Sequence, residues 1–251
     1  MSKSPMSQFV VHKIIPIQMG GFDFSFTNSS LSMVICSLIV FAISFIAVCN
    51  CKVVPMRLQS IFEIMYQFVM STLCDSAGPK SKSFFSFVFS IFVFLATANV
   101  LAMFPYLFSF TSQIAITASF SLLIILIVMV SGFYKNGLGF LKLFVPADIP
   151  TVMKPLVCFV EITSFISRPI SLSLRLFANM LAGHIMLKVF AGFSTFMVSN
   201  GSIMGMTFSF LPLFVNVVIT GLEFFVAFMQ AYIFMMLTCL YISDVYKCDQ
   251  H

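Results

Sequence analysis

The chain has 251 residues, of which 60% are hydrophobic and only 8% are charged, and its mean hydropathy is +1.09. A water-soluble domain carries about 25% charged residues, so this composition excludes a soluble globule and predicts a polytopic membrane protein. The net charge of +5 is modest. Because the basic residues lie in loops near the ends of apolar segments, a nucleic-acid partner is not expected.

Residues 1–30 form an N-terminal extension without the pattern of a cleavable signal. Residues 31–49 contain no charged side chain and are long enough to cross a bilayer as one helix. We therefore expect this first span to remain in the product.

Two different patterns follow the first span. Residues 52–82 mix charged with apolar side chains, which suits an amphipathic helix at the membrane interface better than a second crossing. Residues 84–133 contain no charge and are too long for one span. Pro105 and the polar residues 109–113 interrupt this stretch near its middle, so it predicts a helical hairpin.

The last two apolar regions, residues 151–192 and 206–246, are each longer than one ordinary span. A helix over 151–192 would measure roughly 60 Å, about twice the thickness of the hydrocarbon core. It must therefore tilt steeply or lie partly along the membrane plane, and Pro169 is a point where it can bend. The polar turn 194–205 joins the two helices into a hairpin.

These elements predict an all-α fold, with residues 1–251 as a single membrane domain. It would have about five membrane helices, including two long, strongly tilted helices that form a hairpin, plus one amphipathic interfacial helix. Basic residues gather in 50–82 and 134–154, whereas the turns 109–112 and 194–205 carry no charge. The excess of positive charge on the inner side places the N-terminus outside and the C-terminus inside.

Arg175 lies within an otherwise apolar stretch and requires an explanation. An arginine at the bilayer centre costs roughly 2.5 to 3.5 kcal/mol on insertion scales, so it is expected to meet a partner or a wet cavity. Its guanidinium cannot lose its proton in a protein, so it can act as a fixed charge but not as a proton carrier. A snorkelling or ion-paired arginine is the alternative interpretation.

Titratable side chains stand on both sides of Arg175. Glu161 lies about 21 Å toward the inner end of the same helix, and His184 and Glu223 flank the outer turn. Carboxylates and imidazoles can exchange protons near neutral pH when their surroundings tune them. Glu223 also belongs to a stripe with Asn216 and Gln230, because a spacing of seven residues keeps side chains on one helix face.

Two strings carry a family resemblance: Leu-Arg-Leu-Phe-Ala-Asn-Met-Leu-Ala-Gly-His at 174–184 and Glu-Phe-Phe-Val-Ala-Phe-Met-Gln-Ala-Tyr-Ile-Phe at 223–234. With this layout the chain resembles subunit a of the rotary ATP synthase, called subunit 6 in mitochondria, from about residue 85 to residue 244. The resemblance implies a subunit that is not an enzyme by itself. It would form two offset half-channels that carry protons to and from a ring of c subunits.

The resemblance also implies residue roles. Arg175 matches the essential arginine that faces the ring carboxylate, and Glu161 with Ser171 matches the inner half-channel. The residues that match the outer inlet region are His184, Glu223, Asn179 and Gln230. Asn99 matches an asparagine of the hairpin near the proton path. Lys188 departs from the apolar residue expected there, and it lies one turn beyond His184 on the same face.

Partners and location follow from the same resemblance. The expected partners are the c-subunit ring, the peripheral stalk, other membrane subunits and membrane lipids such as cardiolipin, with protons as the transported ion and no cofactor or metal. The order of His184 and Glu223 is the mitochondrial arrangement, so the mitochondrial inner membrane is expected, with the bacterial plasma membrane as the alternative. Two other function classes are a secondary transporter and a proton-channel subunit of a respiratory complex. The sequence shows no inverted repeat of the kind that secondary transporters usually contain.

Overall fold

The computed structural model describes residues 10–16, 18–19, 22–23, 25–49, 57–104, 107–137, 153–199 and 207–247. Within these ranges, five helices are long and apolar enough to cross a membrane. The predicted all-α polytopic membrane protein with about five membrane helices is therefore confirmed.

The N-terminal extension contains short strands that the sequence analysis did not foresee. β1 (Lys13–Ile15) pairs antiparallel with β4 (Phe26–Thr27), and β2 (Gln18–Met19) pairs antiparallel with β3 (Phe22–Asp23). α1 (Asn28–Cys49) begins directly after β4. The hydroxyl oxygen of Thr27 accepts the backbone N–H of Ser30, which satisfies one of the free donors of the first helical turn.

α2 (Arg57–Ala77) lies within the segment expected at the interface, and residues 52–56 of that segment lie outside the described residues. It ends at Gly78, whose φ of 77° is a conformation that glycine adopts without strain. The 3₁₀ helix η2 (Pro79–Phe84) then leads into α3 (Phe85–Ala102). α2 packs against α3 and α7, which fixes it to the bundle.

The first arm of the predicted hairpin ends a few residues before Pro105, near the expected interruption. α3 ends at Ala102, shortly before Pro105, which disfavours helical backbone at Phe104. The 3₁₀ helix η3 (Phe110–Ser112) follows, and the second arm is α4 (Ile114–Asn136).

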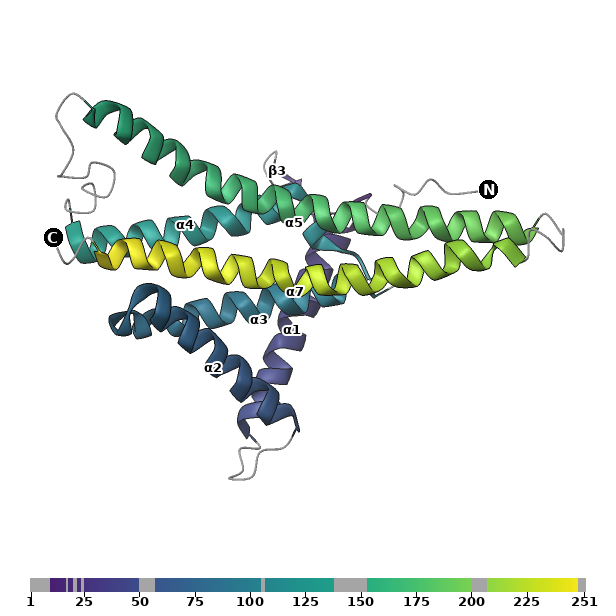
Figure 1. The fold of residues 1–251 in the computed structure, drawn as a ribbon, viewed down its shortest axis with the longest axis horizontal. Helices are drawn as coiled ribbons and strands as arrows, with labels where there is room; N and C mark the ends of the chain where they lie inside the picture. Colours follow the sequence, from purple (N-terminus) through teal and green to yellow (C-terminus); the bar gives the residue numbers. More distant parts are fainter. Residues whose placement is uncertain are drawn as a thin grey trace.

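α5 (Lys154–Ser199) and α7 (Phe210–Lys247) run side by side along the long axis of the molecule (Figure 1). α5 continues beyond the expected limit at residue 192, into residues predicted to form the turn. The hydroxyl of Thr195 donates to the carbonyls of Ala191 and Gly192, so this polar side chain is satisfied inside the helix. Pro169 lies inside α5, and the N-terminal half of α5 diverges from α4 and α7 (Figure 1).

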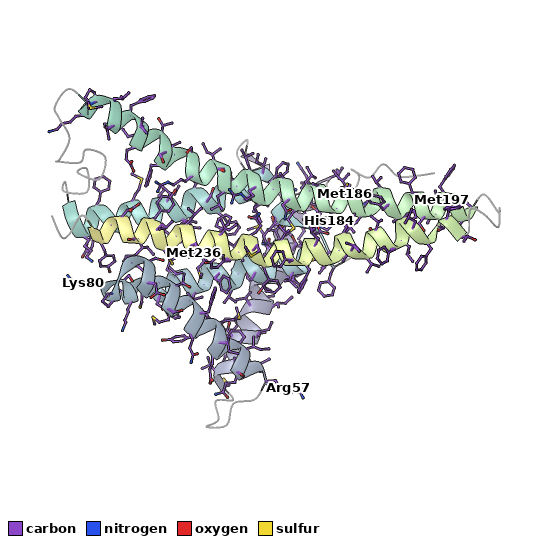
Figure 2. The ribbon with its side chains drawn as sticks, in the orientation of Figure 1. Arg57, Lys80, His184, Met186, Met197 and Met236 are labelled. Atoms are coloured by element: carbon purple, nitrogen blue, oxygen red, sulfur yellow. The ribbon has the colours of Figure 1, made fainter. Side chains whose placement is uncertain are left out.

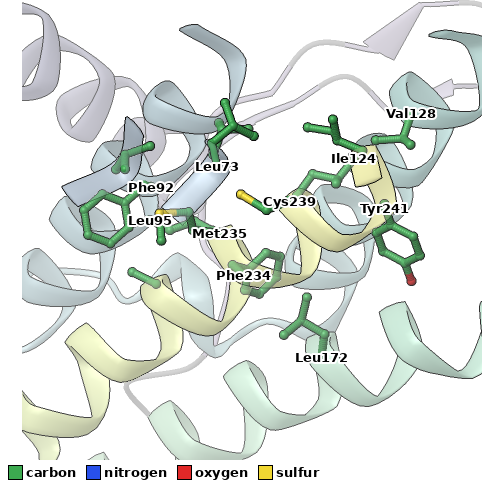
Figure 3. Packing of buried hydrophobic residues seen from close by; sticks show 14 of the residues in the cluster. Leu73, Phe92, Leu95, Ile124, Val128, Leu172, Phe234, Met235, Cys239 and Tyr241 are labelled. Carbon is green, nitrogen blue, oxygen red and sulfur yellow. The ribbon is translucent and has the colours of Figure 1, made fainter. Parts of the chain in front are cut away.

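The main hydrophobic core forms where α2, α3, α4, α5 and α7 meet. Figure 3 shows this packing around α7, with contributions from each helix such as Leu73, Leu95, Val128, Leu172 and Phe234. The bundle thereby holds the inner and middle parts of α7 in fixed positions. The outer halves of α5 and α7 extend past α3 and α4 (Figure 1).

Candidate functional site

α5 presents two chemically different faces at the level of Arg175. Leu176 and Met180 are buried against the bundle, whereas Arg175 and Ser171 are exposed. Within the part of the chain that the structure describes, the guanidinium of Arg175 has no ion-pair or hydrogen-bond partner. The fixed positive charge therefore faces away from this chain, toward whatever lies beside α5.

Glu161 lies near the inner end of α5, about 40° around the helix from Arg175. It is half-buried, and the described residues include no ion pair that involves it. The ion pair nearest to this end joins Arg168 to Asp244 of α7, with 3.9 Å between Nη1 and Oδ2. Glu161 is thus separated along α5 from His184 and lies on nearly the same helix face as Arg175.

Asn99 ties α3 to α7 in the interior. Its side chain is fully buried, and its Nδ2 donates to the carbonyl of Ala227 at 3.1 Å. Ala227 packs with Ala102 of α3 and Met180 of α5 in one buried cluster. Three helices therefore meet at this point, one turn of α7 from Glu223 and close to Gln230.

Glu223 lies directly against Gly183 of α5. A Cβ atom placed on Gly183 would lie 2.5 Å from Oε1 and 2.7 Å from the carboxyl carbon of Glu223, which is closer than such atoms approach. Any larger residue at this position would require the carboxyl group of Glu223 to shift. Because Gly183 precedes His184, the close helix contact brings the acid beside the histidine segment.

His184 lies where α5 runs beside α7 (Figure 2). Its imidazole makes a hydrogen bond with the backbone of Ala102, at the end of α3. The last carbonyls of a helix lack intrahelical partners, so this end of α3 can accept an imidazole N–H. His184 is thereby held at the junction of α3, α5 and α7. Lys188, one turn further out, is exposed.

Several buried polar atoms around this junction have no partner among the described residues. They come from α3, α5 and α7: Asn99 Oδ1, Asn179 Nδ2, Asn216 Oδ1, Gln230 Oε1 and both carboxylate oxygens of Glu223. Burying a polar group without a hydrogen bond is unfavourable, and buried water commonly supplies the missing partner. These atoms are therefore candidate binding sites for buried water beside titratable groups. Among the described residues, no group of three or more acidic, histidine or cysteine side chains could hold a metal ion.

The family profile described as ATP synthase A chain matches residues 30–243. The chain belongs to the ATP synthase subunit a family. ATP synthase subunit a of Rhizobium johnstonii is 52% identical over 251 residues, which is 100% of both chains, and that of Sinorhizobium fredii is 50% identical over the same length. ATP synthase subunit a of a Chelativorans species is 52% identical over 244 residues, which is 97% of this chain and 98% of that protein.

In this member of the ATP synthase subunit a family, the predicted site residues fall into two places. Asn99, Glu223 and Gln230 are buried at the interior junction with His184. Arg175 and Ser171 are exposed on α5, with the half-buried Asn179 one turn beyond Arg175 and the half-buried Glu161 toward the other end of the helix. The contact between Gly183 and Glu223 was missed by the sequence analysis, although the glycine stands inside the string at 174–184. Asn216 was recognised only as part of the stripe on α7.

Proposed function

We propose that the chain is the proton-conducting stator subunit in the membrane sector of a rotary ATP synthase. It acts as a single membrane domain, residues 1–251, that forms two offset half-channels beside a ring of c subunits. The observation that carries this proposal is the position of Arg175, whose charge faces outward from α5 while unpartnered polar atoms gather in the interior.

Protons enter from the outer side through the interior junction. His184 and Glu223 are the titratable groups of this inlet, and Asn179, Gln230 and Asn99 hold water beside them. Amide side chains suit this role because they offer both donors and acceptors to water. The proton then passes to a ring carboxylate next to α5.

Arg175 keeps the two half-channels apart. Its fixed charge repels hydronium and favours the ionised form of a carboxylate that comes near it. A ring site that reaches Arg175 therefore releases its proton toward Ser171 and Glu161 on the inner side. Protons then pass from one half-channel to the other only when the ring rotates. The membrane potential supplies about 2.3 kcal/mol per charge per 100 mV for this rotation.

The proposed partners are the c-subunit ring, the peripheral stalk, other membrane subunits and anionic lipids such as cardiolipin. The chain moves protons without covalent chemistry and is not a catalytic subunit. The three relatives named above are bacterial proteins, so we place the chain in a bacterial plasma membrane. They give no support to the mitochondrial type or the mitochondrial inner membrane expected from the order of His184 and Glu223.

Reconstitution distinguishes this function from that of a self-contained transporter. The tagged chain is purified with its partners and placed in vesicles, and ATP-driven acidification is measured. We expect proton transport only when a ring of small carboxylate-bearing subunits co-purifies with the chain. Proton transport by the chain alone, freed of the ring, would contradict the proposal.

A further inference from the structure

The turn between α3 and α4 contains two buried hydroxyl groups outside the predicted site. Ser109 is 7% exposed and Thr111 is 2% exposed, and neither hydroxyl oxygen has a partner among the described residues. The turn satisfies other hydroxyls locally, since the hydroxyl of Ser112 donates to the carbonyl of Ser109 at 2.6 Å. The hydroxyls of Ser109 and Thr111 are therefore available to bind water.

This turn lies against the wall that holds His184. η3 packs against α5 and α3, and the end of α3 provides the backbone of Ala102 that bonds His184. Phe110, between the two hydroxyl residues, packs into a cluster with Cys36 and Ala98 and so anchors the turn. The apolar side chain between the two hydroxyls thus anchors the turn to α1 and α3.

The turn also offers a short way out of the bundle. α3 and α4 stop well before the outer end of the α5–α7 pair (Figure 1). The charge bias places this uncharged turn on the outer side of the membrane. A path from His184 to the outer side is therefore shorter through this turn than along the outer halves of α5 and α7.

Resting on the proposed function, we propose that Ser109 and Thr111 hold water at the outer mouth of the proton inlet. Protons reach His184 and Glu223 through the turn between α3 and α4. The two hydroxyls act as positioning residues: they orient water and do not themselves gain or lose a charge.

The test removes each hydroxyl with little change in shape, in the complete ATP synthase in vesicles. Thr111→Val and Ser109→Ala are compared with Thr117→Val and Ser121→Ala, whose buried hydroxyls already donate to carbonyls of α4. We expect the first pair to slow proton-driven ATP synthesis by about two- to tenfold, the range for losing one hydrogen bond, with a steeper dependence on outer pH. The control pair should keep the unaltered pH profile.

Thr111→Ser retains the hydroxyl and should restore the rate if Thr111→Val slows it. Should Thr111→Val not assemble, Ser109→Ala and Thr111→Ser carry the comparison. Equal rates and equal pH profiles in all variants would overturn the assignment of the mouth.

Glu223→Gln, measured in parallel, separates this proposal from the proposed function. If Glu223→Gln slows synthesis while Ser109→Ala and Thr111→Val do not, only the assignment of the mouth is wrong. If Glu223→Gln has no effect, the inlet itself is wrong.

Discussion

Glu223 is a carboxylic acid that is 3% exposed inside a membrane helix. Neither of its carboxylate oxygens has a partner among the described residues. An isolated buried carboxylate is strongly unfavourable, so water or a proton must compensate it. A carboxylic acid in this setting is suited to take up and release protons.

Replacing Glu223 by Gln tests that role. The amide keeps the shape of the side chain but cannot carry a proton, so we expect uptake from the outer side to slow by about tenfold or more, since a positioned acid or base contributes roughly 10² to 10⁴ in rate. Proton flux into vesicles that contain the assembled complex is the measurement. Unchanged flux would remove Glu223 from the inlet.

Gly183→Ala tests the close contact between α5 and α7. The added methyl group must displace the carboxyl group of Glu223, and overpacking of this kind costs about 1 to 3 kcal/mol. We expect slower proton uptake and a lower thermal midpoint of the complex. Gly192→Ala and Gly221→Ala are matched controls, because a Cβ atom at either glycine meets open space. Equal losses in all three variants would show that the contact is not specific.

The sequence analysis named polar candidate residues for the site but did not predict this glycine contact. Arg175, His184 and Glu223 stand out as candidates in the sequence because charged and titratable groups are rare in membrane helices. Gly183 carries no such signal, since its role depends on how closely two helices approach each other. That distance follows from packing over both helices and is not encoded in either string alone.

At the scale of elements, α5 and α7 form an antiparallel pair with contacts at two levels. Glu223 meets Gly183 in the middle, and near the outer end the hydroxyls of Ser194 and Ser209 lie 2.9 Å apart. Together these contacts set the register between the two long helices. The register in turn decides which residues of α7 face His184.

This register predicts a disulfide in the double variant Ser194→Cys, Ser209→Cys. The two hydroxyl oxygens lie 2.9 Å apart, so the side chains are in direct contact. A disulfide joins Cβ atoms about 3.5 to 4.5 Å apart, a separation that two side chains in contact can reach. After mild oxidation of membranes, mass spectrometry of peptides should find the two positions linked. Thr195→Cys with Ser209→Cys is the control, because Thr195 points elsewhere on α5 and should link poorly. Efficient linkage of the control alone would place the helices in another register.

The helices were predictable to different degrees. Length and the absence of charge predicted the membrane helices, but α5 continues past its expected end at residue 192. Thr195 was assigned to a turn because it is polar, whereas its hydroxyl bonds within the helix. The short strands near Lys13 and Phe26 lacked a sequence pattern long enough to recognise.

At the scale of the whole molecule, the proposed path uses contacts between distant parts of the chain. Asn99 and Ala227 are 128 residues apart in sequence and joined by a hydrogen bond. Helical periodicity places residues on faces but does not say which faces meet. The convergence of α3 with α5 and α7 is therefore a result of the structure.

The molecule by itself provides one wall of the proposed proton path. Large apolar side chains remain exposed on both long helices, such as Phe193 on α5 and Phe225 on α7. Exposed apolar surface of this kind suits contact with lipid or with other membrane proteins. Arg175 lies exposed on α5 as well, and a neighbouring ring would supply the carboxylate that its charge requires.

The most direct test of the account is proton-coupled ATP synthesis in vesicles that contain the complex with Arg175→Ala. We expect the complex to assemble and its synthesis to fall to the level of vesicles without the enzyme, because nothing then separates the two half-channels. Arg168→Ala is the control: this arginine lies two turns away on the same helix and is paired with Asp244, and coupled synthesis should persist. Near-normal coupled synthesis with Arg175→Ala would contradict the account.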